Sequence, residues 1–123
     1  MQHILVIDDE ENIRFMMQEA LVNAGYQVTI TANGKEAERL YTRQTFDLVI
    51  TDIFMPEKEG FEVMLELLSV NPDSKIIAIT GGGIMTKETV LKMAEEFGAV
   101  HCLSKPFLIS DLIKIIRNLL NPQ

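Results

Sequence analysis

The sequence predicts an α/β fold built on one parallel β-sheet. Short apolar runs alternate along the chain with longer segments of helical periodicity, a pattern typical of repeated strand–helix units. Five such units can be read in the 123 residues. Strands of a parallel sheet are covered by helices on both faces, so nearly continuous apolar runs are expected rather than alternating ones.

The strands are predicted where apolar residues run together. They are expected at Ile4–Ile7, Gln27–Ile30, Leu48–Thr51, Lys75–Ile79 and Val100–Leu103. Each run is followed by a segment long enough to return the chain to the opposite edge of the sheet. All five strands should therefore point the same way.

Helix ends are marked by capping and helix-breaking residues. The first helix should run from Glu11 to Asn23, with Gly25 ending it. The side chain of Asn33 can cap the second helix. The other boundaries are expected at Asn71-Pro72 (end of the third), Thr86 and Gly98 (start and end of the fourth) and Ser110 (start of the fifth).

Apolar residues at helical spacing predict the face that each helix buries. In chain order, these stripes are Ile13, Met16, Met17, Ala20 and Leu21; Ala37, Leu40 and Tyr41; Phe61, Met64, Leu65 and Leu68; Val90, Met93, Ala94 and Phe97; and Leu112, Ile113, Ile116, Leu119 and Leu120.

Five strands are too few for an eight-stranded barrel, so an open sheet is expected. The simplest arrangement is a flavodoxin-like (βα)5 sandwich with strand order 2-1-3-4-5. In such sheets, ligands bind outside the carboxyl ends of the strands, where the strand order reverses. Here that point lies between the first and third strands, next to Asp8, Asp9 and Asp52.

Carboxylates gather at this predicted crevice. Asp8-Asp9-Glu10 follow the first strand and Asp52 follows the third. Two unit charges about 4 Å apart repel by roughly 4 kcal/mol at an effective dielectric near 20. A hard cation relieves that repulsion, and carboxylate oxygens suit Mg²⁺. The pattern therefore predicts a Mg²⁺ site.

Two polar groups complete the same edge. Thr80 ends the fourth strand, before Gly81-Gly82-Gly83, and Lys105 follows the fifth strand, before Pro106-Phe107. A hydroxyl and an ammonium beside a metal supply donors for an anion. A phosphoryl group on one of the carboxylates would use all of these parts.

Each feature alone has a structural interpretation. Acids are favoured at helix N-termini, Asp52 could be a turn residue, the Thr80 loop could be a flexible connection, and Lys105 could be solvated. The four features follow successive strands in one order, and this consistency favours a common site.

The ordered set resembles the receiver domain of two-component response regulators, and the resemblance covers the whole chain. It rests on Asp8-Asp9, on Asp52 with Met55-Pro56 and Gly60 downstream, on Thr80 before its glycine-rich loop, and on Lys105-Pro106-Phe107. The resemblance implies a phosphoacceptor switch with Asp52 as the nucleophile.

The resemblance also implies the other roles at the site. Asp9 and Asp52 would bind Mg²⁺ directly, with the backbone carbonyl of Phe54 as a third ligand, and Asp8 would act mainly through a water. Lys105 would pair with a phosphoryl oxygen, and the Lys105–Pro106 peptide bond would be cis. Thr80 would donate its hydroxyl to the phosphoryl group and move inward, which is the switch.

One position departs from the family pattern. Family members usually carry Tyr or Phe three residues before the lysine, where the ring moves together with the threonine. Cys102 occupies that position here. A small packed residue is the expected role of Cys102, so the aromatic half of the switch is in question.

The implied partners are a sensor histidine kinase or a histidine phosphotransfer protein as phosphodonor. An effector protein or a second copy would bind the face formed by the fourth helix, fifth strand and fifth helix. The protein is expected to be a signalling switch that catalyses its own phosphorylation and dephosphorylation, rather than an enzyme with turnover.

Composition limits the alternatives. Residues 1–123 fit a single receiver domain, with no output domain in this chain. The net charge of -7 disfavours direct nucleic-acid binding. The single cysteine favours a reducing compartment, and no signal peptide or membrane span is expected, so a cytoplasmic location is predicted.

Three other functions are alternatives to this prediction. A phosphorylation-independent interaction module with the receiver fold is the strongest alternative. A flavin-binding electron carrier would need hydroxyls and amides in the first loop, where Asp8-Asp9-Glu10 stand. A phosphatase of the haloacid dehalogenase type would need a general acid at the position of Phe54.

Overall fold

The structure is a computed structural model of residues 1–123, and it describes all of them except 54–59, 81–87, 89–91, 93–95, 97 and 121–123. The side chain of residue 61 also lies outside the description.

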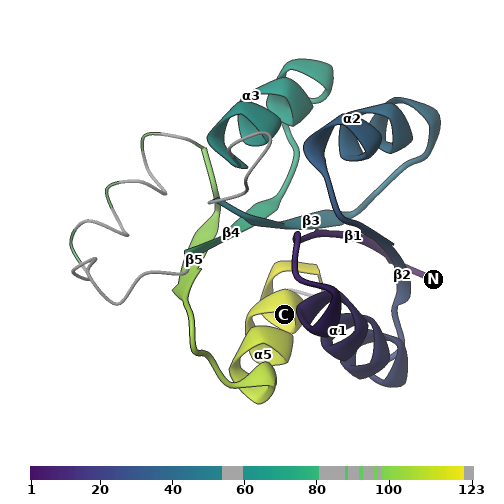
Figure 1. Ribbon diagram of the computed structural model, residues 1–123, viewed down its shortest axis with the longest axis vertical. Coiled ribbons are helices and arrows are strands. Elements are labelled where there is room, and N and C mark those ends of the chain that lie inside the picture. Colours follow the sequence, from purple (N-terminus) through teal and green to yellow (C-terminus); the bar gives the residue numbers. More distant parts are fainter. Residues whose placement is uncertain (54–59, 81–87, 89–91, 93–95, 97, 121–123) are drawn as a thin grey trace.

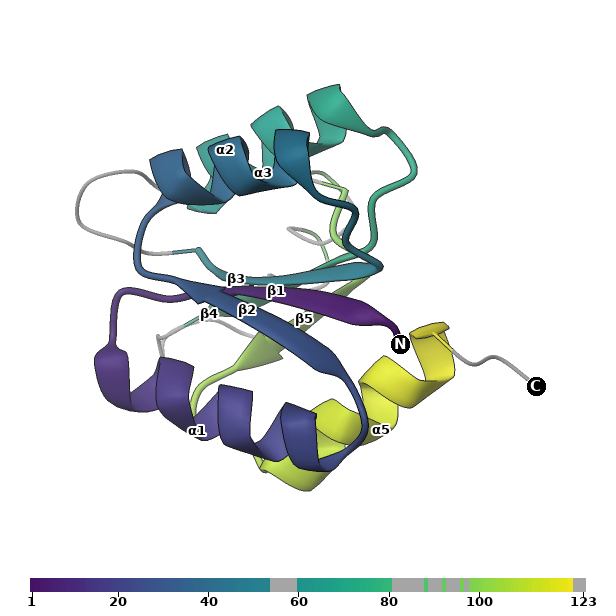
Figure 2. The ribbon, with the colours of Figure 1, turned by 90° about the vertical axis from the view of Figure 1, so that its right-hand side faces the viewer.

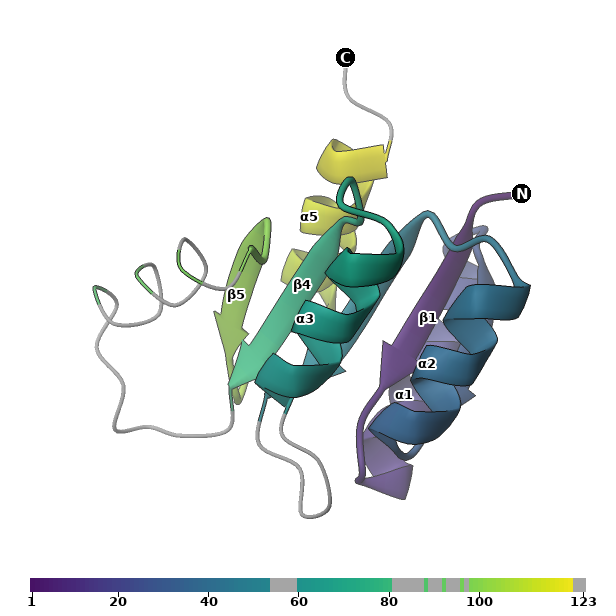
Figure 3. The same ribbon diagram turned by 90° about the horizontal axis from the view of Figure 1, so that it is seen from above.

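Five parallel strands form a single sheet in the order β2-β1-β3-β4-β5, as predicted. Their bounds are β1 (His3–Ile7), β2 (Gln27–Thr31), β3 (Leu48–Asp52), β4 (Ile76–Thr80) and β5 (His101–Ser104). The α/β fold and the flavodoxin-like strand order are therefore confirmed. In Figure 3 the arrowheads of β1, β4 and β5 lie at one edge of the sheet, and the N-terminus lies at the opposite edge.

Helices cover both faces of the sheet, as Figures 1 and 2 show. α2 (Gly34–Arg43) and α3 (Gly60–Val70) lie on one face, and α1 (Glu11–Asn23) and α5 (Ile109–Leu120) lie on the other. Between β4 and β5, Glu88, Lys92 and Glu96 are helical and exposed. The predicted cap Thr86 and the apolar stripe of the fourth helix lie outside the described residues.

Two hydrophobic clusters hold the layers together, one on each face of the sheet. Alternate residues of each central strand point to opposite faces. Leu5 and Val49 therefore pack toward α2 and α3, while Val6 and Ile50 pack toward α1 and α5. All four side chains are at most 1% exposed, which explains the continuous apolar runs of the sequence.

Several predicted helix ends are confirmed. The side chain of Asn33 accepts a hydrogen bond from the backbone N–H of Glu36 at 2.8 Å, which caps α2. α3 ends at Val70, directly before Asn71-Pro72. Gly25 follows α1 with a φ of 101°, a backbone conformation that favours glycine.

The prediction that Met16 and Leu65 are buried is wrong. Met16 in α1 is 44% exposed, and Leu65 in α3 is 56% exposed. Met64 is buried as predicted, but α3 is rotated so that Val63 and Leu67 are buried beside it. Apolar residues occupy most positions of α3, so helical spacing alone does not determine which stripe faces the sheet.

None of the described helices combines the length and the apolar character that crossing a membrane requires.

Candidate functional site

The register of the sheet places Asp8 beside Asp52. Ile7 at the end of β1 pairs with Thr51 in β3, so the residues that follow each of them are neighbours. The backbone N–H of Asp8 donates to the carbonyl of Thr31 at 3.2 Å, which extends the sheet by one more bond. Asp8 is only 1% exposed and Asp52 only 4%, so both carboxylates are buried at the carboxyl edge.

Four carboxylates converge at this edge. Oxygens of Asp8, Asp9, Glu10 and Asp52 lie within 4.8 Å of one another. Asp9 and Glu10 are exposed and therefore form the outer part of the cluster. Oxygen donors at this spacing fit a divalent cation such as Mg²⁺. The predicted ligand at the Phe54 carbonyl lies outside the described residues.

Lys105 reaches the same cluster from the end of β5. Thr80 pairs with Ser104, and the backbone N–H of Lys105 donates to the carbonyl of Thr80 at 2.8 Å. The ammonium of Lys105 lies 3.0 Å from Asp52 Oδ2 and 3.3 Å from Asp8 Oδ2. The Lys105–Pro106 peptide bond is cis.

Glu10 is the third carboxylate in contact with Lys105. Its Oε1 atom lies 3.4 Å from Lys105 Nζ. The sequence pattern did not indicate a role for Glu10 beyond its membership of the acidic triplet Asp8-Asp9-Glu10. Adjacency alone did not reveal the contact, because it depends on a lysine that lies 95 positions away along the chain.

Burial and charge shift two ionisation equilibria at this edge. Burial of Lys105 disfavours its charge, but the hydrogen bond to Asp52 and the charges of Asp8 and Asp52 outweigh that effect and raise its pKa. Burial also raises the pKa of Asp8, and the backbone N–H of Glu10 and the charge of Lys105 offset this only in part. Lys105 is therefore charged at neutral pH, and ionised Asp8 is costly.

The raised pKa of Asp8 predicts that Asp8→Asn stabilises the metal-free protein at pH 7. When the pKa of a carboxyl group is higher in the folded than in the unfolded state, the group stabilises the fold below its ordinary pKa of 3.8. This stabilisation is lost as the pH rises through the raised pKa of the folded state. Removing the charge should add about 1 kcal/mol to the free energy of unfolding, because the variant buries a neutral amide in place of an ionised carboxylate.

Urea denaturation in EDTA measures this effect. Asn keeps an oxygen that can accept the 2.9 Å hydrogen bond from the Glu10 backbone N–H. The advantage of Asp8→Asn should shrink as the pH falls below the raised pKa of Asp8. Asp73→Asn, at an exposed turn position, is the control and should change stability by less than about 0.5 kcal/mol. A destabilised Asp8→Asn variant at pH 7 would contradict the prediction.

Thr80 is fully buried at the end of β4. Its hydroxyl oxygen lies 3.4 Å from the carbonyl oxygen of Leu103 and 3.4 Å from Ser104 Oγ, and both of these atoms are acceptors for the hydroxyl proton. Asp52 pairs with Ile79, so Thr80 follows the strand position beside Asp52. The hydroxyl is thus at the same edge as the acids, held by hydrogen bonds to β5.

Cys102 lies in the middle of β5, opposite Ala78. It is partly buried and, like Leu68 and Ala99, packs against the hydrophobic cluster that contains Leu5, Val49 and Met64. Burial raises the pKa of its thiol. Cys102 therefore has the environment of a small packing residue rather than that of a reactive thiolate.

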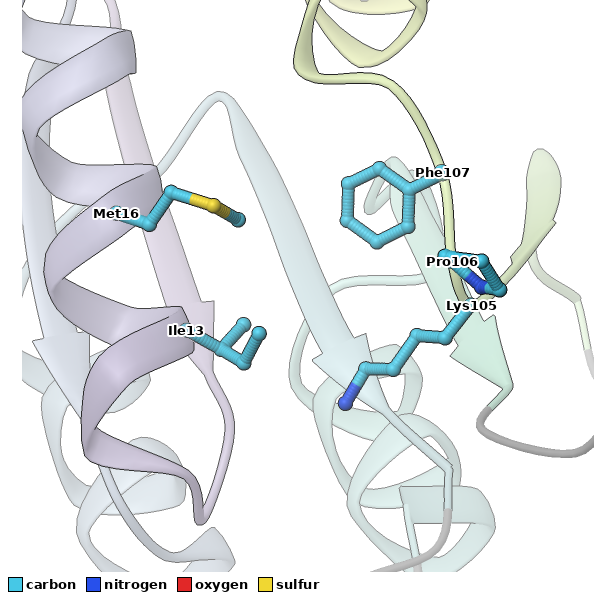
Figure 4. A pocket seen from close by; sticks show the side chains of 5 residues that line it. All are labelled: Ile13, Met16, Lys105, Pro106 and Phe107. Atoms are coloured by element: carbon cyan, nitrogen blue, oxygen red, sulfur yellow. The ribbon is translucent and has the colours of Figure 1, made fainter.

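A hollow adjoins the acidic cluster on the side of α1. It has a volume of about 390 Å³ and is lined by Ile13, Met16, Lys105, Pro106 and Phe107. In Figure 4, Ile13 and Met16 of α1 face Phe107, and the Lys105 side chain extends along the hollow. Sequence spacing did not predict this hollow, because it places Met16 in the core, whereas Met16 is exposed in the structure.

An α/β sheet that ends in buried carboxylates, a buried threonine and a lysine defines a class of domain with an acidic site at its switch point. Comparison with known proteins makes the class specific. The protein-family model of the response regulator receiver domain matches residues 4–117 of the sequence. The chain therefore belongs to the receiver domain family of two-component response regulators, and it is a signalling-switch domain.

Similar proteins agree with this assignment. The response regulator receiver protein CpdR of Brucella abortus is 34% identical, with 98% of each chain covered. The transcriptional regulator NtrC of Azospirillum brasilense is 33% identical, but the chain spans only 24% of its length. The crystal structure of the response regulator TrrA from Thermotoga maritima has a TM-score of 0.83 and 34% identity, covering 98% of this chain and all of that one.

Proposed function

We propose that Asp52 is the phosphoacceptor and that Mg²⁺ supports its phosphorylation. The observation that carries this proposal is the contact of a buried Asp52 carboxylate with the Lys105 ammonium at 3.0 Å, inside a cluster of four acids. A buried carboxylate with a cation beside it and a metal-compatible set of oxygens has the parts that phosphoryl transfer requires.

The cation site is proposed for Asp8, Asp9 and Asp52, with the Phe54 carbonyl as a further ligand. The described oxygens fit a hard cation in type and spacing. When bound, Mg²⁺ would supply positive charge that offsets the charge of the carboxylates and of the incoming phosphoryl oxygens. The structure of TrrA was determined in complex with Mg²⁺ and a beryllium fluoride, which supports this part of the proposal.

The covalent step belongs to Asp52. A carboxylate oxygen of Asp52 attacks the phosphorus of a phosphohistidine on a histidine kinase or phosphotransfer protein. The new P–O bond forms as the P–N bond breaks, and the imidazole nitrogen leaves with the bonding electrons. Lys105 stabilises the transferred oxygens by charge. Hydrolysis of the acyl phosphate at the same site would reset the switch.

Thr80 is the proposed switch residue. Its hydroxyl would leave the carbonyl of Leu103 and the hydroxyl of Ser104 and donate to the phosphoryl group. Because Thr80 bonds across to β5, its movement would be felt by β5 and by Cys102 within it. The readout would be a changed surface around β5, α5 and the helix that precedes β5, recognised by an effector protein or a second copy.

The proposed setting is a single cytoplasmic receiver domain in residues 1–123 that acts through protein contacts. CpdR is matched over 98% of its own length, so that relative is a receiver protein of about this size. The similarity to NtrC over 24% of that protein would fit a receiver attached to further domains.

The proposal predicts one added phosphoryl group when the protein is incubated with acetyl phosphate and Mg²⁺. Intact mass spectrometry of the wild type measures the gain, and the same incubation in EDTA should show almost none, because the crowded carboxylates would repel the donor. Absence of any gain in folded protein with Mg²⁺ would contradict the proposal and favour a phosphorylation-independent interaction module.

A further inference from the structure

The Lys105 ammonium contacts three carboxylates. A lysine ammonium has three N–H donors, and here Asp52, Asp8 and Glu10 lie at 3.0, 3.3 and 3.4 Å from Nζ. The Lys105 side chain is 18% exposed, so these contacts hold it at the rim of the site. Each N–H that turns toward a carboxylate is unavailable to another anion.

Glu10 differs from the other two carboxylates in exposure. Its side chain is 60% exposed, compared with 1% for Asp8 and 5% for Asp52. It also lies outside the proposed set of Mg²⁺ ligands. Glu10 is therefore the member of this group that can change without altering the buried acids.

The backbone of Glu10 is held in place while its carboxylate is turned to Lys105. The Glu10 backbone N–H donates to Asp8 Oδ1 at 2.9 Å, and its carbonyl accepts from the Arg14 N–H at 3.1 Å. Glu10 is the N-cap residue of α1, yet its side chain makes no capping hydrogen bond. The carboxylate thus contributes to the site rather than to the end of the helix.

We propose that Glu10 is a positioning residue that holds the Lys105 ammonium in the resting state and thereby slows phosphoryl transfer to Asp52. This inference rests on the function proposed above. Lys105 must turn an N–H toward the phosphoryl group in the transition state. An interaction that is strong in the ground state and weakened in the transition state raises the barrier.

Among the three carboxylates, Glu10 is the one that competes most directly with the phosphoryl group for the Lys105 ammonium. Asp52 itself receives that group, and Asp8 belongs to the proposed metal site. Exposed or half-exposed ion pairs are typically worth 0.2 to 1 kcal/mol. Releasing this pair should therefore accelerate phosphorylation by about 1.4- to fivefold.

The test compares Glu10→Gln with Glu11→Gln. Gln is close to Glu in size and removes only the charge, and Glu11 is an exposed acid at the first position of α1, so its variant removes the same charge nearby. Rates of mass gain are measured with acetyl phosphate at saturating Mg²⁺. Both substitutions are repeated in a Lys105→Ala background, followed for as long as that slower protein requires.

We expect Glu10→Gln to be about 1.4- to fivefold faster than the wild type and than Glu11→Gln, with no acceleration in the Lys105→Ala background. A rate equal to that of Glu11→Gln would overturn the inference. So would an acceleration that persists without Lys105, because it would then arise from the charge of Glu10 alone. A wild type that gains no mass would overturn the proposed function, and this inference with it.

A second readout needs neither Mg²⁺ nor a phosphodonor. Urea denaturation in EDTA of the wild type, Glu10→Gln, Lys105→Ala and the double variant gives the coupling between the two side chains. The contact predicts a favourable coupling that changes the unfolding equilibrium constant by up to about fivefold. Additive effects would show that Glu10 does not hold Lys105, and would overturn the inference even if the rates differ.

Discussion

Replacing Asp52 with alanine should abolish the Mg²⁺-dependent gain of a phosphoryl group from acetyl phosphate. The variant lacks the carboxylate that lies 3.0 Å from the Lys105 ammonium at the end of β3. Asp8 is a poor substitute, because one of its oxygens accepts the Glu10 N–H and the other faces Lys105. Intact mass after incubation should remain that of the unmodified protein.

Asp73→Ala provides the matched control for this experiment. Asp73 is an exposed acid in the turn before β4, and its loss changes the net charge by the same amount. This variant should gain mass at the rate of the wild type. Circular dichroism establishes that Asp52→Ala is folded. If folded Asp52→Ala still gained mass as fast as the wild type, another residue would be the acceptor, and peptide mapping would locate it.

Leu67→Ala should lower the free energy of unfolding by about 2 to 5 kcal/mol. Leu67 is fully buried between α3 and the sheet, in the cluster that also contains Val63 and Met64. Removing its side chain loses the transfer free energy of the buried atoms and leaves a cavity. A loss of this size is a large part of the 5 to 15 kcal/mol that stabilises a typical domain.

Leu65→Ala is the control within the same helix. Leu65 is 56% exposed, so its truncation should change stability by less than about 0.5 kcal/mol. Both substitutions replace leucine with alanine in α3, so helix propensity contributes equally to each. Urea denaturation with a common slope compares them. A larger loss for Leu65→Ala than for Leu67→Ala would mean that α3 buries the stripe expected from sequence spacing.

Much of the fold was predictable because its signals are local. The central strands are buried on both faces and therefore consist of continuous apolar residues such as Leu48–Ile50. Helix ends depend on side chains within a few positions, as Asn33 and Glu36 show. In a sheet of parallel strands, knowing where each strand ends also predicts which residues share an edge.

The rotation of the helices was not predictable in the same way. Met16 and Leu65 are apolar residues at suitable spacing, yet both are exposed. A helix that is apolar around most of its circumference has several possible buried faces, and the choice depends on how it packs against the sheet and the neighbouring helix. The hollow beside Lys105 has the same origin, because it requires Met16 to face Phe107.

The acidic site, too, was predictable only in part from the sequence. The residue types and their order along the chain pointed to Asp8, Asp52, Thr80 and Lys105 at one edge, since parallel strands bring their carboxyl ends together. The pairing of Lys105 with Asp52, Asp8 and Glu10 joins residues 53, 97 and 95 positions apart. Such contacts depend on strand register and side-chain burial, which arise only when distant segments pack against one another.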